Sequence, residues 1–303
     1  MIDFKRLQLS DRAIYAPLLE NAGERGCEYS FANLYLWGRQ RAAMVSGCMV
    51  LFSQFNRKTV YLFPVGPGDR KAAVDAIIHD AACRGIPCRI TSLVESDIQW
   101  LEGCYPGRFR FHDDRDGFDY VYDIHALADL KGRAYQKKRN HVNKFCQTFP
   151  QAKAVPLTKA LLPAVEEMLE RWYDCRLAQD PRADFHMERS ALAKALRDFE
   201  ALGMEGMVLL CGDKVLAFTL GSPLTATTFD IHFEKAAADA ELAYPAINQA
   251  FARYLREKYP ALLYLNREDD MGLEGLRKAK LSYCPHHMVE KSWACLLEDG
   301  YDY

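Results

Sequence analysis

The clearest candidate for catalytic or binding chemistry in this sequence is a run of ionisable residues on a predicted strand. Residues 227–234 (TTFDIHFE) are rich in β-branched and aromatic side chains, which predicts a strand. Side chains alternate between the faces of a strand, so Asp230, His232 and Glu234 share one face, and apolar residues occupy the other. Buried strands of α/β sheets are usually apolar on both faces, so this row predicts a polar cleft. An exposed face or an internal salt-bridge network is the alternative.

A second polar group, Asn266-Arg267-Glu268-Asp269-Asp270, follows the strand predicted at residues 262–266. Carboxylates and imidazoles are general bases, and the candidates for a catalytic base are Glu234, Glu268, His232 and Asp269. The candidates for substrate binding include Asp230, Asn266 and Arg267. The guanidinium group of Arg267 can bind a carboxylate or phosphate through two parallel hydrogen bonds. A simple ion pair between Arg267 and Glu268 is the alternative. Lys278, Lys280 and Tyr283 come next, and they are further candidates for ligand contact, although Tyr283 near Pro285 is also typical of packing.

A dense basic stretch covers residues 131–144 and contains six cations. In a helix, Arg133, Lys137, Asn140, His141 and Lys144 would lie along one face. Such a stripe suits the phosphates of tRNA, coenzyme A or a lipid head group. The substrate-binding candidates in this stretch are Lys138, Arg139, Asn140 and Lys144. The alternative is a solvated helix face.

A glycine turn in the first half, Gly66-Pro67-Gly68-Asp69-Arg70, lies between a predicted strand and a predicted helix. Glycines at such a place allow backbone N–H groups to approach a phosphate at the helix amino end. Gly66, Gly68 and Arg70 are therefore candidates for cofactor binding. A plain tight turn is the alternative, and the corresponding stretch of the second half, residues 235–243, contains no glycine.

The elements that must position these residues alternate between strands and helices. In the first half the predicted elements are strands at 48–55 and 58–65 joined across Asn56-Arg57, a helix over 73–81 closed by Gly85, a strand at 88–92, a helix at 95–103, and a hairpin of 109–111 with 118–124. In the second half they are helices around 161–172 and 192–199, strands at 206–211 and 215–221 joined by Gly212-Asp213, the strand at 227–234, a helix from Pro245, a strand at 262–266, a helix at 273–281 and a strand at 287–297. Both halves show the same order of elements, which favours two similar domains, 1–129 and 130–303. A single α/β domain without symmetry is the alternative.

The bulk properties exclude several classes of protein. The chain has 303 residues and a net charge of −2, so no global basic field attracts nucleic acid. No apolar run approaches the length of a membrane span, and the start has no apolar signal core, so we expect a cytoplasmic protein. Ten scattered cysteines without a CxxC pair predict reduced thiols and no metal site, since Cys284, His286 and His287 are too close in sequence for a good tetrahedral site. No Ser/His/Asp triad motif, P-loop or dinucleotide fingerprint occurs, and residues 112–116 are expected to form an exposed charged loop.

Three long segments carry a family resemblance. They are LKGRAYQKKRNHVNKF at 130–145, NREDDMGLEGLRKAKLSY at 266–283 and EYSFANLYLW at 28–37. They resemble the phosphatidylglycerol lysyltransferase C-terminal-domain family, and the element order is similar to the GNAT acyltransferase fold, with two units in one chain as in Fem-type peptidyltransferases. The resemblance implies an α/β (α+β) protein of two tandem GNAT-like acyltransferase domains. The best-known members move lysine from lysyl-tRNA to a membrane lipid and carry a large transmembrane region.

The resemblance also implies where the chemistry lies. In the GNAT arrangement the strands ending at Glu234 and Asn266 are neighbours that splay apart, so both polar groups line one crevice, mainly in the second half. The implied reaction is direct transfer of an acyl or aminoacyl group from aminoacyl-tRNA or acyl-CoA to an amine or hydroxyl of a small molecule, lipid or peptide. One alternative is a CoA-dependent N-acyltransferase using Gly66–Arg70, although Phe63 stands where that pattern has Arg or Gln, and Pro67 removes a donor. The other alternative is a non-catalytic binding or regulatory protein on the same fold.

Overall fold

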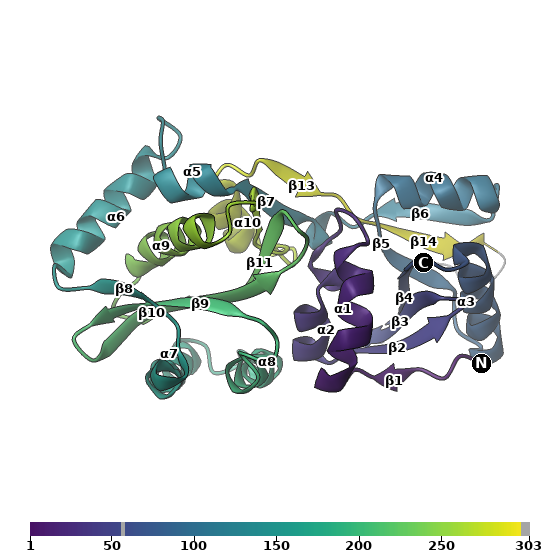
Figure 1. The fold of residues 1–303 in the computed structure, drawn as a ribbon, viewed down its shortest axis with the longest axis horizontal. Helices are drawn as coiled ribbons and strands as arrows, with labels where there is room; N and C mark the ends of the chain where they lie inside the picture. Colours follow the sequence, from purple (N-terminus) through teal and green to yellow (C-terminus); the bar gives the residue numbers. More distant parts are fainter. Residues whose placement is uncertain (56–57, 298–303) are drawn as a thin grey trace. The chain divides into compact units, whose positions relative to one another are not determined.

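The computed structural model describes residues 1–55 and 58–297 and shows a mixed α+β chain built on two seven-stranded sheets (Figure 1). The predicted connection at Asn56-Arg57 lies outside the described residues. Within the described residues, no helix is long and apolar enough to cross a membrane.

The first half contains most of the first sheet. Its elements are β1 (Lys5–Arg6), α1 (Arg12–Glu20), α2 (Phe31–Trp37), β2 (Gln40–Val45), β3 (Cys48–Phe55), β4 (Lys58–Val65), α3 (Arg70–Arg84), β5 (Arg89–Leu93), α4 (Glu95–Cys104), β6 (Phe109–Asp113), β7 (Asp119–Asp123) and α5 (Ile124–Asp129). The predicted strands and helices are confirmed here within a few residues. His112 and Asp113 belong to β6 rather than to the expected loop, although both are exposed.

Local sequence signals explain α3. Asp69 accepts a hydrogen bond from the backbone N–H of Ala72 at 2.9 Å, which satisfies a donor that the first helical turn leaves unpaired. Gly85 ends the helix in the left-handed conformation, with φ of 63°, which glycine adopts without strain. The apolar stripe of α3 packs into the core of the first sheet, together with Tyr61 and Phe63.

The second half follows the same order of elements. They are α6 (Gln136–Thr148), β8 (Lys153–Pro156), α7 (Leu162–Gln179), α8 (His186–Arg197), β9 (Glu205–Cys211), β10 (Lys214–Pro223), β11 (Thr228–Ala236), α9 (Ala243–Lys258), β12 (Tyr264–Asn266), α10 (Glu274–Leu281), β13 (His287–Val289) and β14 (Ser292–Leu296). The basic stretch is helical only from Gln136, so Arg133 precedes the helix. Gly212 adopts φ of 60° in the β9–β10 turn, as the Gly-Asp pair predicts.

The two halves exchange one strand each. The first sheet has the order β1-β2-β3-β4-β5-β14-β6, and the second has the order β13-β7-β12-β11-β10-β9-β8. In each sheet an antiparallel series leads to one parallel pair, β4–β5 or β11–β12, and the next strand comes from the other half of the chain. The predicted hairpin of 109–111 with 118–124 is therefore wrong, because β6 pairs with β14 and β7 pairs with β12. The single strand predicted at 287–297 is likewise two strands that belong to different sheets.

This exchange makes both compact units discontinuous in sequence. The first unit comprises Met1–Asp119, Asp269–Glu274 and Met288–Tyr303, and the second comprises Tyr120–Glu268 and Gly275–His287. The order of elements in the sequence instead predicts one boundary, between residues 129 and 130. The difference has a physical cause, since backbone hydrogen bonds attach β14 to the first sheet and β7 to the second.

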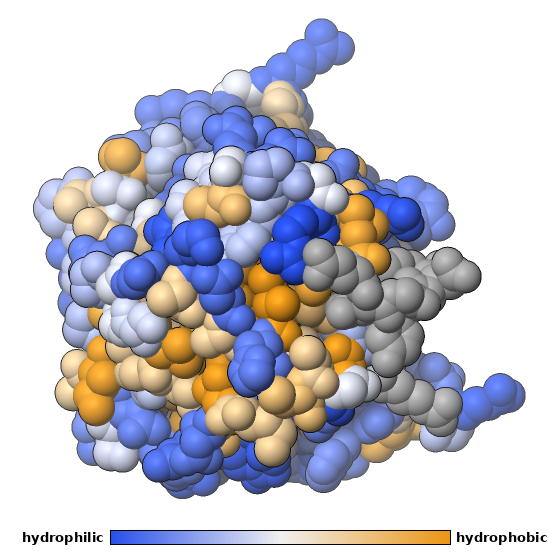
Figure 2. Space-filling model, turned by 90° about the vertical axis from the view of Figure 1, so that its right-hand side faces the viewer, coloured by the Kyte–Doolittle hydropathy of each residue, from blue (hydrophilic) through white to orange (hydrophobic). Residues whose placement is uncertain are grey.

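Apolar residues also reach the surface. Figure 2 shows the side of the molecule that carries α3, α4 and β14, where apolar and hydrophilic residues are interspersed. Apolar atoms make up more than half of most protein surfaces, so this face indicates no function by itself.

Candidate functional site

An irregularity in strand β11 divides the ionisable row into two groups. In the pairing of β10 with β11, Leu220 lies opposite Phe233, whereas Gly221 lies opposite Ile231. His232 is therefore an extra residue, and such bulges bend a strand and redirect its side chains. The predicted single row is wrong in this respect, because His232 and Glu234 contact different partners.

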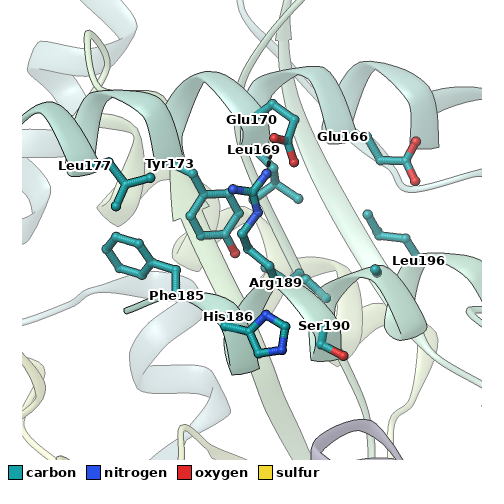
Figure 3. Close-up of a pocket in the computed structure, with 12 residues that line it drawn as sticks. Glu166, Leu169, Glu170, Tyr173, Leu177, Phe185, His186, Arg189, Ser190 and Leu196 are labelled. Atoms are coloured by element: carbon teal, nitrogen blue, oxygen red, sulfur yellow. Dashed lines mark hydrogen bonds and ion pairs between the residues drawn. The ribbon is translucent and has the colours of Figure 1, made fainter. Parts of the chain in front are cut away.

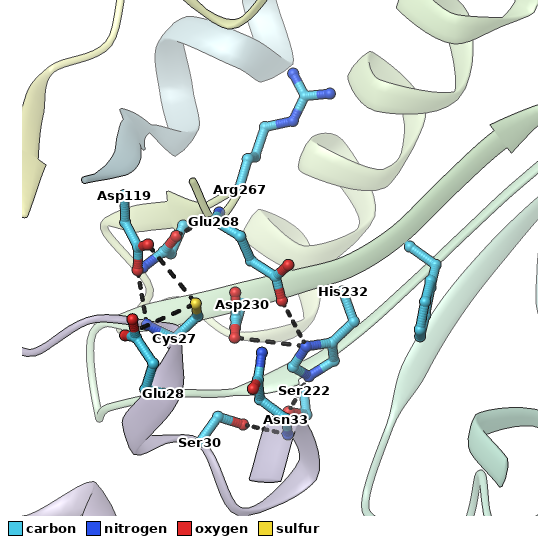
Figure 4. A network of polar contacts seen from close by, with 12 residues as sticks. Cys27, Glu28, Ser30, Asn33, Asp119, Ser222, Asp230, His232, Arg267 and Glu268 are labelled. Atoms are coloured by element: carbon cyan, nitrogen blue, oxygen red, sulfur yellow. Dashed lines mark hydrogen bonds and ion pairs between the residues drawn. The ribbon is translucent and has the colours of Figure 1, made fainter. Parts of the chain in front are cut away.

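The first group surrounds the His232 imidazole (Figure 4). Its Nδ1 atom lies 3.2 Å from Glu268 Oε1 and 3.5 Å from Asp230 Oδ2, and its Nε2 atom lies 2.9 Å from Ser222 Oγ. The side chains of Asp230 and His232 are almost completely buried. Asn266 is buried too, and its Oδ1 accepts a hydrogen bond from the Glu268 N–H at 2.7 Å. Asn266 thus orients the backbone that presents Glu268 to His232. We call Ser222, Asp230, His232 and Glu268 the histidine group.

The second group surrounds Arg267. Its Nη2 donates to Glu234 Oε1 at 2.9 Å, and Asn248 of α9 donates to Glu234 Oε2 at 3.3 Å. The guanidinium carbon lies 4.9 Å from the centre of the Tyr283 ring, within the range of a cation–π contact. Figure 4 shows the consecutive side chains of Arg267 and Glu268 pointing in different directions. Arg267 pairs with Glu234, and His232 pairs with Glu268, so the alternative of a simple Arg267–Glu268 ion pair does not describe these contacts.

Lys138 of α6 joins the second group. Its Nζ atom lies 3.6 Å from the centre of the Tyr283 ring and donates to Ser282 Oγ at 2.7 Å. Burial, with repulsion from Arg267 and Lys137, lowers the pKa of Lys138 to about 8. Burial raises the pKa of Tyr283 to about 12, so its phenol stays neutral at physiological pH. We call Lys138, Glu234, Asn248, Arg267 and Tyr283 the arginine group.

Two atoms of the arginine group are buried and make no hydrogen bond within the described residues. They are Arg267 Nη1, a donor, and Asn248 Oδ1, an acceptor. Burying polar atoms without partners costs free energy, so such atoms in a native fold call for an explanation. Asn248 was not among the residues predicted from the sequence. Its signal was a polar residue on the apolar face of α9, next to Ile247 and near Phe251.

Other predicted residues support the site or lie outside it. Lys280 is buried and donates to the carbonyl oxygen of Arg267 at 2.5 Å, so it holds the backbone rather than a ligand. Arg139 donates to the carbonyl oxygens of Leu130 and Gly132 and so holds the segment that precedes α6. Asn140, Lys144 and Lys278 are exposed. Asp269 belongs to the first unit, as does Asp270, which accepts a hydrogen bond from the Gly272 N–H at 2.9 Å.

The glycine turn has a packing explanation. A Cβ atom on Gly68 would lie 2.1 Å from the Ser46 carbonyl oxygen, and the Asp69 N–H donates to that same oxygen at 2.8 Å. Gly66 adopts φ of 133°, which side chains rarely allow. The Arg70 guanidinium lies over the rings of Phe63 and Trp100, at 5.4 and 5.6 Å. These contacts account for Gly66, Gly68 and Arg70 without a ligand.

A groove between α7 and α8 is separate from both groups (Figure 3). It is lined by apolar side chains such as Leu169 and Leu196, and an ion pair joins Arg189 to Glu170. None of the predicted site residues lines this groove, so the groove and the candidate catalytic residues lie at different places.

Comparison with known proteins identifies the class. The chain is a mixed α+β protein with two sheets, and its fold is similar to that of FemX, as the resemblance to Fem-type proteins implies. The family described as phosphatidylglycerol lysyltransferase, C-terminal, matches residues 20–295, and the chain belongs to this family.

Solved structures share the fold. A conserved protein of unknown function from Bacteroides thetaiotaomicron is 37% identical, with 98% of this chain and 100% of that chain covered and a TM-score of 0.90. L-PGS from Bacillus licheniformis is 16% identical, with 98% and 94% covered and a TM-score of 0.67. FemX is 11% identical, with 98% of each chain covered and a TM-score of 0.55. An uncharacterised protein of Mycoplasmoides gallisepticum is 23% identical over 205 residues, which are 67% of this chain and 63% of that relative, so the chain spans less than two thirds of that relative's length.

Proposed function

We propose that the protein is an aminoacyltransferase. It moves an aminoacyl group from an aminoacyl-tRNA to an amine or hydroxyl of a lipid or peptide acceptor, by direct transfer. Two facts support this proposal: membership of a family named for lysyl transfer, and the position of Arg267 and Lys138 over the ring of Tyr283, with Glu234 paired to Arg267.

The observation that carries the proposal is the pair of buried atoms without partners. Arg267 Nη1 offers a donor and Asn248 Oδ1 offers an acceptor, and both residues are also hydrogen-bonded to Glu234. An aminoacyl ester presents the complementary atoms, a carbonyl oxygen that accepts and an α-ammonium group that donates. Binding such a group satisfies both buried atoms at once.

The same residues supply the chemistry. The acceptor attacks the ester carbonyl, its proton passes to the Glu234 carboxylate, and Arg267 stabilises the oxyanion that develops. The carbon–oxygen ester bond then breaks, and the Lys138 ammonium gives its proton to the leaving tRNA oxygen. A pKa of about 8 suits Lys138 to this step, because a general acid works best when its pKa lies near the operating pH. Glu268 and Asn266 fix the backbone that follows Arg267.

The basic stretch suits the polyanion. Lys137 and Lys144 are exposed on α6, and Arg133 is exposed just before it. Such cations bind the phosphates of tRNA or of an anionic lipid with an affinity that falls as salt rises.

The test is a transfer assay with a pool of labelled aminoacyl-tRNAs, using phosphatidylglycerol vesicles and a short amine-bearing peptide as alternative acceptors. We expect Arg267→Met to lower kcat about 10²–10³-fold, as loss of an oxyanion donor does. Glu234→Gln should also lower kcat, and the exposed Glu241→Gln should leave it unchanged. Thermal unfolding of each variant separates lost chemistry from lost fold.

Other outcomes would redirect the assignment. Transfer from acetyl-CoA alone would favour the CoA-dependent N-acyltransferase. Binding of aminoacyl-tRNA without transfer to either acceptor would favour a non-catalytic binding protein. Full activity in both Arg267→Met and Glu234→Gln would refute the arginine group as the site.

A further inference from the structure

The histidine group lies beside the proposed transfer site and takes no part in its chemistry. One ligand-type atom each of Asp230, His232 and Glu268 lies within 4.8 Å of the others. They come from β11 and from the residues just after β12, the two strands of the parallel pair. The pairing of Asp230 with Asn266 brings the strand that carries Asp230 and His232 next to the segment that carries Glu268.

The spacing matches a coordination shell. Ligands held at about 2.0–2.1 Å from a tetrahedral zinc ion lie roughly 3.3 Å from one another. His232 Nδ1 lies 3.2 Å from the Glu268 oxygen and 3.5 Å from the Asp230 oxygen, on either side of that value. One imidazole and two carboxylates form a ligand set that zinc accepts, with a water in the fourth position.

Ser222 supplies a further element of such a site. Its hydroxyl lies 2.9 Å from His232 Nε2, so it can accept the Nε2–H hydrogen bond and leave the Nδ1 lone pair facing the carboxylates. Ligating histidines are usually held in this way by a hydrogen bond at the other ring nitrogen.

A nucleophilic triad has the same contacts, from a serine to a histidine to a carboxylate. The burial of Ser222 and His232 argues against that role. Ser222 is only 3% exposed and His232 only 7% exposed. An acyl substrate must reach a catalytic serine, whereas a cation needs only to pass the Glu268 side chain, which is the most accessible of the three ligands. The geometry therefore favours an ion over a covalent intermediate.

We propose that Asp230, His232 and Glu268 bind one divalent cation of the zinc class. The ion takes the two carboxylates and the imidazole as ligands and holds Glu268 in place next to Arg267. This replaces the expectation of no metal, and it involves none of Cys284, His286 and His287. The proposal does not depend on the aminoacyl-transfer reaction, because cation binding is measured without turnover.

The experiment is calorimetric titration of the full chain with ZnCl₂ after dialysis against EDTA, together with elemental analysis of the protein as purified. We expect one zinc per chain, and at least tenfold weaker binding of Mg²⁺, which prefers an octahedral shell of oxygen atoms. Asp230→Asn and His232→Gln should each weaken zinc binding at least tenfold. Glu234→Gln, a carboxylate on the same strand outside the group, should bind zinc as the unsubstituted protein does.

Free thiols require their own control. The protein has ten cysteines and could bind zinc adventitiously, so the titration is repeated with Co²⁺. We expect a cobalt spectrum without a sulfur-to-metal charge-transfer band, and unchanged binding in Cys284→Ser. Absence of stoichiometric zinc binding would overturn the proposal, as would full retention of zinc by folded Asp230→Asn and His232→Gln.

Discussion

Each unit contains a pair of neighbouring carboxylates, and the two pairs contact different nitrogen groups. In the first unit, Lys291 is 2% exposed and places its ammonium 2.6 Å from Asp119 and 2.7 Å from Glu28. The backbone N–H of Cys27 also donates to Asp119, at 2.6 Å. In the second unit, Asp230 and Glu268 share an imidazole instead.

The difference separates a structural group from a candidate binding site. Two carboxylates and a permanent ammonium form a closed ion network, which suits a structural role. An imidazole carries a fixed charge only when it is protonated, and its neutral form is a metal ligand. In the first unit the two carboxylates therefore already have a cation, the ammonium of Lys291. In the second unit the two carboxylates and the imidazole form a ligand set to which a cation can bind.

Loss of the internal cation should have the largest effect. We expect Lys291→Met to lower the free energy of unfolding by about 3–5 kcal/mol, because it leaves the buried carboxylate of Asp119 and the partly buried carboxylate of Glu28 without their ammonium partner. Although burial opposes it, attraction to Asp119 and Glu28 raises the pKa of Lys291 well above 10.5. The stabilisation is therefore complete below pH 10.5 and is lost only as pH rises through the folded-state pKa.

Urea unfolding across this pH range checks the prediction, with the exposed Lys5→Met as the control. Equal stability of Lys291→Met and Lys5→Met would remove the contrast between the two groups.

A second lysine should behave in the opposite way. Burial and cationic neighbours lower the pKa of Lys138 to about 8, so its ratio of neutral amine to ammonium at neutral pH is about 300-fold that of an ordinary lysine. We expect trinitrobenzenesulfonate to label Lys138 faster than its exposed neighbour Lys137, as measured by peptide mass spectrometry. Arg267→Met should slow the labelling of Lys138, because it removes a repulsion that keeps the pKa low. Labelling in the opposite order would contradict the lowered pKa.

The same substitution in the two groups should give different responses to zinc. At a free zinc concentration of 100 Kd, we expect zinc to stabilise the unsubstituted protein by about 2.7 kcal/mol. Asp119→Asn should lower the basal stability but keep this increment, whereas Asp230→Asn should lose the increment. Thermal unfolding with and without zinc measures both terms. Loss of the increment in Asp119→Asn alone would place the cation in the first unit.

The smallest effect concerns the glycine turn of the first unit. A Cβ atom on Gly68 meets backbone, so Gly68→Ala should destabilise the protein by about 1–3 kcal/mol, as overpacking does. Gly103 in α4 has open space around it, and Gly103→Ala should stabilise the protein by up to about 1 kcal/mol. A thermal shift with coenzyme A that Gly68→Ala abolished would instead restore the turn as an anion site.

The local sequence determined most of the elements and much of the candidate chemistry. Hydrophobic periodicity and turn residues located α3, β10, β11 and α9, because these signals act within a few residues of one another. Glu234, His232, Arg267 and Glu268 stand out in the sequence because ionisable side chains are unusual at the ends of buried strands.

Only the tertiary structure decided how these residues combine. Strand exchange depends on pairing between β5, β6 and β14, which lie far apart in the chain, so no local pattern reveals it. The bulge at His232 is one residue of register between β10 and β11, yet it divides the ionisable row into two groups. Alternation along one strand cannot encode that shift, because register belongs to the pair of strands.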